Sequence, residues 1–148
     1  MKAMVIETSK GTIVCDLRTD AKDGVSGTVA NFENKANAGD FDGRIFHRVE
    51  NWVIQGGDPL GTGTGGGKIP AEYNKAHFSA GALGVARGSD KSRNNDSQFF
   101  ITKSDSGWLD GEYTNFGQVI EGLDVVKKIA IGDKINSIRV EERDATNS

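Results

Sequence analysis

Short stretches in which apolar and polar positions alternate run along most of the chain. In Thr12–Leu17 every second residue, including Cys15, lies on one apolar face, which is typical of a half-buried β-strand. A turn at 9–11 separates this stretch from Met4–Thr8, so the two are predicted to form a hairpin. Because Cys15 lies on the apolar face, we expect a buried and unreactive thiol.

Two stretches have the longer spacing of an amphipathic helix, Thr28–Ala38 and Glu121–Ala130. A glycine follows the first, and lysines favour the C-terminal end of the second. Their apolar stripes are Val29, Phe32 and Ala36 in the first helix and Leu123, Val126 and Ala130 in the second.

Between and after these helices lie further short stretches that resemble strands. Many short strands with glycine-rich connections and only two helices indicate a mainly β fold, a barrel or a sandwich. No repeat or long linker divides the chain, so residues 1–148 are predicted to form a single domain. The strand-like stretches are Ile45–Val49, Trp52–Gln55, Leu83–Arg87, Gln98–Thr102, Asn115–Ile120 and Ile135–Glu142.

Composition narrows the classes of function. The formal net charge is −3 and no basic stripe is present, which argues against nucleic-acid binding. One cysteine cannot form an internal disulfide, so nothing indicates an oxidising compartment. The first 17 residues are too polar for a signal peptide or a membrane span. We therefore expect a cytoplasmic protein without membrane contact.

Common catalytic and cofactor motifs find little support. The glycine-rich stretch Gly61–Lys68 matches G-x-G-x-x-G literally, but it runs into Ile69-Pro70 and does not open a helix, so a mobile loop that needs positive φ angles is the better interpretation. The two histidines, His47 and His77, lie far from each other and from Cys15, which disfavours a zinc site. We expect no metal and no cofactor. A nucleotide-dependent enzyme remains a distant alternative.

Three segments carry the remaining unusual residues: FHRVENWVIQGGD at 46–58, SQFFI at 97–101 and WLDGEYTNFG at 108–117. Strand alternation places Phe99 and Ile101 toward the core, and Gln98 with Phe100 on the opposite face. Val53 and Gln55 project together, opposite Trp52 and Ile54, and His47 alternates with Arg48 and is expected to be structural. The result is a face of amide and apolar side chains near an arginine.

With these three segments in this order and a helix near each end, the chain resembles the cyclophilins over nearly its whole length. The resemblance implies an eight-stranded antiparallel closed β-barrel capped by two α-helices, with a shallow proline-binding groove on its outer surface. Arg48 matches the catalytic arginine of the family. The other matching positions are Trp52, Val53, Phe100 and Leu109 in the proline pocket, Gln55 and Gln98 as its polar residues, Ala86 and Arg87 as the residues whose backbone meets the substrate, and Trp108 as the tryptophan associated with cyclosporin.

The chain also departs from the family pattern. Tyr113 stands where many members have a histidine, and it keeps an aromatic wall with a polar tip. The loop from Arg87 to Asp96 is about two residues longer than in eukaryotic relatives and more charged. Val25-Ser26 replaces the usual Ala-Pro before the first helix. These changes bear on substrate preference and drug affinity more than on the fold or the reaction.

The resemblance implies a peptidyl-prolyl cis-trans isomerase in which Arg48 stabilises the twisted X-Pro amide. Its partners would be proline-containing peptides, unfolded or partly folded proteins, and cyclosporin, and we expect a monomer. A second hypothesis is a proline-directed binding module or chaperone that keeps the groove with little turnover. The presence of Arg48 favours the enzyme, because binding alone does not require that donor.

Overall fold

The structure, a computed structural model, describes residues 1–144, and an antiparallel sheet of eight strands is its main element. The strands lie side by side in the order β10-β1-β2-β9-β6-β8-β4-β3. Short antiparallel hairpins and longer returns connect them, as in other all-β domains. Their bounds are β1 Lys2–Thr8, β2 Gly11–Leu17, β3 Phe46–Val49, β4 Val53–Gly56, β6 Ala82–Val85, β8 Phe99–Thr102, β9 Asn115–Glu121 and β10 Ile135–Glu142.

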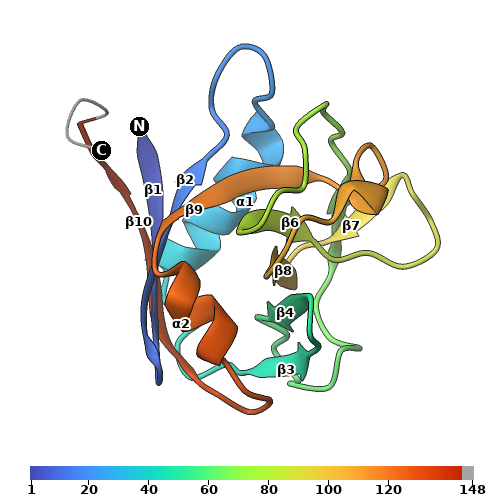
Figure 1. Ribbon diagram of the computed structural model, residues 1–148. Helices are drawn as coiled ribbons and strands as arrows, with labels where there is room; N and C mark the ends of the chain where they lie inside the picture. Colours follow the sequence, from blue (N-terminus) through green and yellow to red (C-terminus); the bar gives the residue numbers. More distant parts are fainter. Residues whose placement is uncertain (145–148) are drawn as a thin grey trace.

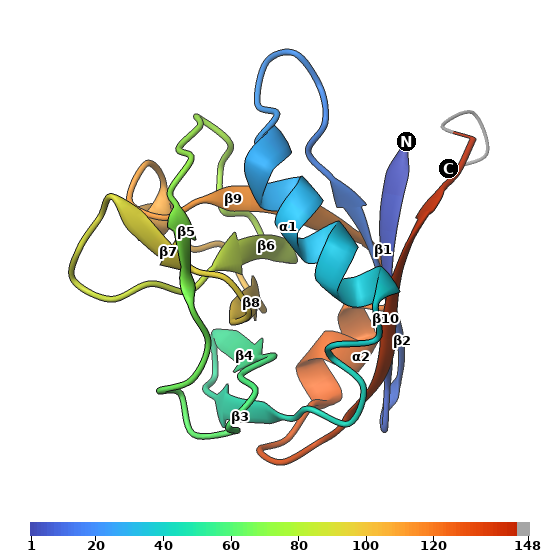
Figure 2. The same ribbon diagram turned by 180° about the vertical axis from the view of Figure 1, so that it is seen from behind.

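The sheet curls round on itself, and helices cover it from both sides. Figure 1 shows α2 (Leu123–Lys128) in front of the curled sheet, and the reverse view in Figure 2 shows α1 (Ser26–Asn37) in front. The end strands β3 and β10 do not form a ladder. They meet through an isolated bridge between Ile45 and Lys134 and nearby backbone hydrogen bonds. The predicted barrel-like fold is confirmed, and its seam is made by this bridge together with these hydrogen bonds.

The main core fills the space between the sheet and α1. Phe32 of α1 stacks on Phe116 of β9 with ring centroids 4.7 Å apart, and Phe99 of β8 meets Phe32 edge to face. All three rings are fully buried. Val29 and Ala36 are also buried, which confirms the predicted stripe of the first helix. Cys15 is buried in the same core, and burial raises the pKa of its thiol to about 12, as expected for an unreactive cysteine.

The second helix is shorter than predicted. Glu121 extends β9 by pairing with Val14, and Gly122, at φ +91°, turns the chain into the helix at Leu123. At the other end Ile129 is extended, so its side chain is buried while Ala130 is exposed. The predicted apolar stripe was therefore wrong at Ala130, because a helical period does not continue past Lys128.

Three short elements, two strands and a 3-10 turn, were not predicted from the sequence pattern. Strands β5 (Lys68–Pro70) and β7 (Arg93–Asn95) form a separate ribbon next to β6 and β8, and a 3-10 turn, η1, covers Gly107–Leu109. These elements carry the loops around the candidate site. Within residues 1–144, no helix has the length and apolar character needed to cross a membrane.

Candidate active site

A small apolar cluster separate from the main core forms the floor of the candidate site. Val53 of β4 and Phe100 of β8 come from the strand faces that point away from the main core, as the alternation predicted. Leu109 of η1 packs against them, and the Phe78 ring stacks on Phe100 at 5.8 Å. Gly84 lies directly under the Phe100 ring, since a Cβ at Gly84 would be 2.2 Å from its Cζ. The floor is thus apolar and closely packed.

Above this floor lies an open cleft of about 720 Å³. The structure brings every sequence-predicted site residue except Gln98 to its lining, although they are spread from residue 48 to residue 113. Gln98 lies behind the lining, where its side chain accepts a hydrogen bond from Gln55. The lining residues are His47, Arg48, Trp52, Val53, Gln55, Thr62, Gly63, Ala86, Arg87, Phe100, Trp108, Leu109, Glu112 and Tyr113.

Aromatic side chains form the walls of the cleft. Trp52 and Trp108 meet edge to face at 5.2 Å, and Trp108 keeps 61% of its surface exposed. Across the floor, Tyr113 meets Phe100 edge to face at 5.7 Å. Trp52 precedes β4, so strand alternation does not apply to it, and it packs on the same cluster as Val53. Partly exposed aromatic rings around an apolar floor suit a small apolar ligand group.

Arg48 is the cation at the edge of this cleft. It lies on β3, and its side chain is about half exposed. Nη1 donates to Gln55 Oε1 at 3.2 Å, Nη2 donates to the Glu50 carboxylate, and the guanidinium carbon is 5.7 Å from the centre of the Trp52 ring. The guanidinium is therefore held from three sides at the border between apolar floor and solvent.

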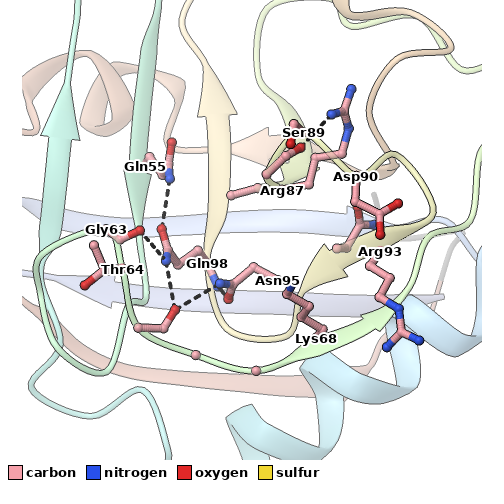
Figure 3. A pocket seen from close by; sticks show the side chains of 16 residues that line it. Gln55, Gly63, Thr64, Lys68, Arg87, Ser89, Asp90, Arg93, Asn95 and Gln98 are labelled. Carbon is pink, nitrogen blue, oxygen red and sulfur yellow. Dashed lines mark hydrogen bonds between the residues drawn. The ribbon is translucent and has the colours of Figure 1, made fainter.

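A chain of amide groups supports Arg48 from behind. Gln55 Nε2 donates to Gln98 Oε1 at 3.0 Å, and Gln98 Nε2 donates to the carbonyls of Gly63 and Gly65 at 3.1 and 3.0 Å. Figure 3 shows this chain beside a second cavity of about 420 Å³. Gln98 is only 3% exposed, so its side chain is fixed by these bonds. The amides connect Arg48 to the glycine-rich loop.

The glycine-rich loop folds around a buried carboxylate. Asp58 accepts hydrogen bonds from the backbone N–H groups of Leu60, Thr62, Gly63 and Gly65. Burial alone would raise the pKa of Asp58, but these donors outweigh it and the pKa is lowered. Gly61, Gly63 and Gly66 have positive φ, which confirms the predicted need for positive φ angles in this loop, and the loop leads into β5.

The opposite rim is built on Ala86 and Arg87. The Ala86 N–H donates to the Gln98 carbonyl and the Ala86 carbonyl accepts from the Asn95 N–H. These bonds leave Arg87 as the better candidate for backbone contact with a ligand. The Arg87 side chain donates to the Glu112 carbonyl and lies over the Tyr113 ring at 4.3 Å. Arg87 therefore fixes a wall of the cleft.

Comparison with known proteins shows the family to which the chain belongs. The family model "Cyclophilin type peptidyl-prolyl cis-trans isomerase/CLD" matches residues 3–146. The chain belongs to this family. It is 46% identical over 121 residues to peptidyl-prolyl cis-trans isomerase B of Bacillus subtilis, covering 78% of this chain and 82% of that protein. It is 42% identical over 147 residues to a peptidyl-prolyl cis-trans isomerase of Synechococcus elongatus, covering 95% and 97%.

A solved structure is similar over the same length. The crystal structure of a Cryptosporidium parvum cyclophilin-type isomerase in the presence of the dipeptide Ala-Pro matches with a TM-score of 0.84 and 29% identity, covering 95% of this chain and 99% of that one. The sequence-based prediction of a cyclophilin with peptidyl-prolyl isomerase activity is thereby confirmed at the level of the family.

Some lining residues of this cyclophilin were missed or misplaced by the sequence pattern. His47 was expected to be structural because it alternates with Arg48, yet it lines the cleft. The β3–β4 register shifts between Phe46 and Arg48, and such a bulge interrupts the alternation. Burial lowers the pKa of His47, and its Nδ1 is buried without a hydrogen-bond partner among residues 1–144. Glu112 and Thr62 also line the cleft; both lie in segments that the sequence analysis singled out, but neither was predicted as a site residue.

The second histidine lies outside the cleft, close to the turn that carries Trp108. The two ring nitrogens of His77 contact Asp110 at 2.5 Å and Asp105 at 2.6 Å. These contacts, first to Asp110 and then to Asp105, raise the pKa of His77. Over residues 1–144, no cluster of three or more histidine, cysteine or acidic side chains is arranged to hold a metal ion.

Proposed function

We propose that the cleft around Arg48 is where this cyclophilin binds X-Pro segments and rotates their peptide bonds. The observation that carries the proposal is the position of the Arg48 guanidinium, fixed by Gln55 at the edge of the apolar floor. In this arrangement the proline ring rests on Val53 and Phe100 between the aromatic walls. The carbonyl before the proline remains free to swing beside Arg48.

Rate enhancement has to come from binding the twisted amide more tightly than the planar one. Rotation about a peptide bond costs ~18–20 kcal/mol, because resonance must be broken. Taking an X-Pro bond from tens of seconds to roughly 10³ turnovers per second requires lowering this barrier by about 7 kcal/mol. Loss of resonance makes the proline nitrogen basic, and Arg48 can donate to it or to the adjacent carbonyl. No bond is broken, and no cofactor takes part in this scheme.

The other residues of the groove are proposed to contact different parts of the substrate or to support Arg48. Trp52 and Leu109 complete the apolar pocket, and Trp108 supplies an indole N–H at the exposed rim. Gln55 and Gln98 hold Arg48 in place. The extended chain before the proline runs past the Arg87 backbone. The C. parvum relative was crystallised in the presence of Ala-Pro, which supports proline-containing peptides as ligands here.

The test is a protease-coupled prolyl isomerase assay on the wild-type protein and Arg48→Ala. We expect the variant to keep its fold and to lose at least tenfold in kcat/KM, about 1.4 kcal/mol of transition-state stabilisation. Unchanged activity in a folded Arg48→Ala variant would rule out the assignment. A wild-type protein that binds proline peptides but does not accelerate isomerisation would favour the alternative, a proline-directed binding module or chaperone.

We also propose that cyclosporin binds this cleft, more weakly than it binds family members with a histidine at the position of Tyr113. A missing hydrogen bond that leaves a buried partner unpaired costs ~1–3 kcal/mol, roughly one to two decades of affinity. Titration of the drug, followed by the fluorescence of Trp52 and Trp108, measures this. Tyr113→His is expected to tighten binding. Unchanged affinity would assign the difference to the loop from Arg87 to Asp96.

The protein is further proposed to act as one domain over residues 1–148, as a monomer, in the cytoplasm. The family match over residues 3–146 supports a single domain, and a free buried Cys15 fits a reducing compartment. Light scattering on a size-exclusion column tests the oligomeric state, and cell fractionation tests the location.

A further inference from the structure

Glu50 is the one acidic side chain in contact with Arg48 among the described residues. It follows β3 directly and lies two residues after Arg48, at the start of the turn that leads to β4. The Glu50 N–H donates to the Val53 carbonyl at 2.8 Å, which fixes its backbone in the β3–β4 hairpin. Its carboxylate accepts a hydrogen bond from Arg48 Nη2.

Glu50 and Gln55 bind the two terminal nitrogens of the guanidinium. Nη2 binds Glu50, Nη1 binds Gln55, and the guanidinium carbon lies over the Trp52 ring, 5.7 Å from its centre. A guanidinium carries about five N–H donors, so these two bonds leave others for a substrate. Because Gln55 is itself fixed by Gln98, it gives Arg48 one rigid contact. One contact alone leaves the planar group free to rotate about it, and Glu50 removes that freedom.

We propose that Glu50 is a positioning residue for catalysis, which orients the Arg48 guanidinium over the apolar floor. The inference rests on the proposed function of Arg48. What matters is the acceptor oxygen at this position in the hairpin. The negative charge is not required, since it opposes the positive field that Arg48 offers to the substrate. An amide of the same length should therefore replace the carboxylate.

The test measures kcat and KM separately for Glu50→Ala and Glu50→Gln. The pair is exposed, and exposed ion pairs contribute little, so we expect Glu50→Ala to lower kcat about twofold to fivefold with KM nearly unchanged. Glu50→Gln should retain wild-type kcat. A matched control is Glu7→Ala, which removes a surface glutamate of β1 that is paired with Arg139 of β10. This variant should leave both kcat and KM unchanged.

A double mutant separates the two levels of the proposal. In an Arg48→Ala background, Glu50→Ala should have no further effect on kcat, because Glu50 acts only through Arg48. If Arg48→Ala lowers activity but Glu50→Ala does not, or raises it, the positioning role is wrong while the catalytic role of Arg48 stands. A Glu50→Gln variant as slow as Glu50→Ala also overturns the proposal. If Arg48→Ala itself has no effect, the proposed function fails first.

Discussion

Both faces of strands β4 and β8 carry buried apolar side chains, yet the two faces have different surroundings. Ile54, Phe99 and Ile101 point into the main core, where Phe32 of α1 meets Phe99. On the other face, Val53 and Phe100 pack on a small cluster whose upper side is the open cleft. The same alternation therefore produces a sealed core and a binding floor. The difference lies in what covers each face, a helix on one side and only rim side chains on the other.

The largest effect that tests this comparison is the removal of each phenylalanine ring. Phe99→Ala should cost about 3–5 kcal/mol of unfolding free energy, because the cavity would lie among Phe32, Phe41 and Phe46. Phe100→Ala should cost about 1–2 kcal/mol less, since one side of its ring faces the open cleft. Its main loss should be isomerase activity, at least tenfold in the folded fraction.

Urea denaturation and the isomerase assay measure the two effects on the same samples. Ile101→Val is the control for a small deletion in the sealed core, expected to cost about 0.5–1.5 kcal/mol with activity unchanged. Equal loss of stability at Phe99 and Phe100, with full activity in folded Phe100→Ala, would show that the two faces do not differ in function.

A smaller difference between the two regions is expected in how their stability depends on pH. Near the cleft, His77 bridges Asp110 and Asp105 on either side of η1, and its pKa is raised from its ordinary value of 6.5. The stability from this bridge is complete below pH 6.5 and disappears as pH rises through the raised pKa. For Asp110, burial would raise the pKa, but His77 and the Phe78 N–H lower it below 3.8, so its contribution is lost only in stronger acid.

His77→Ala should therefore lower the melting temperature at pH 6 more than at pH 9. Thermal unfolding of both proteins at the two pH values measures the difference. The main core supplies the contrast, because Cys15 has a pKa of about 12 and stays neutral across this range. A His77→Ala effect that is equal at both pH values would show that the bridge does not depend on the charge of His77.

Periodicity predicted the elements that pack on the main core. The hairpin of β1 and β2, the stripe of α1 and the bounds of β10 follow from alternation or helical spacing. The shortening of α2 could not be predicted, because it depends on the pairing of Glu121 with Val14. The ribbon of β5 and β7 was missed because Lys68-Ile69-Pro70 and Arg93-Asn94-Asn95 are short, polar stretches without alternation.

The candidate site depended on the resemblance more than on the pattern. Alternation placed Val53 and Phe100 on one face, but only the family motif joined them to Trp108 and Tyr113. Neither source indicated that Glu50 would bind Arg48, because this contact depends on the hairpin geometry. Nor did the sequence show that Gln98 would bond to glycine carbonyls, since backbone acceptors leave no signature in the residue types.

The most direct test of the role of Arg48 is an NMR exchange measurement on a proline peptide saturated with protein. The spectra at saturation report the on-enzyme rate of cis–trans interconversion, and the titration that leads to saturation reports the dissociation constant of the peptide. If Arg48 stabilises the twisted amide, Arg48→Ala should slow the exchange at least tenfold while the dissociation constant changes by less than about threefold. An exchange rate that stays at the wild-type value would contradict this role. So would a decrease in the exchange rate that is no larger than the decrease in peptide affinity.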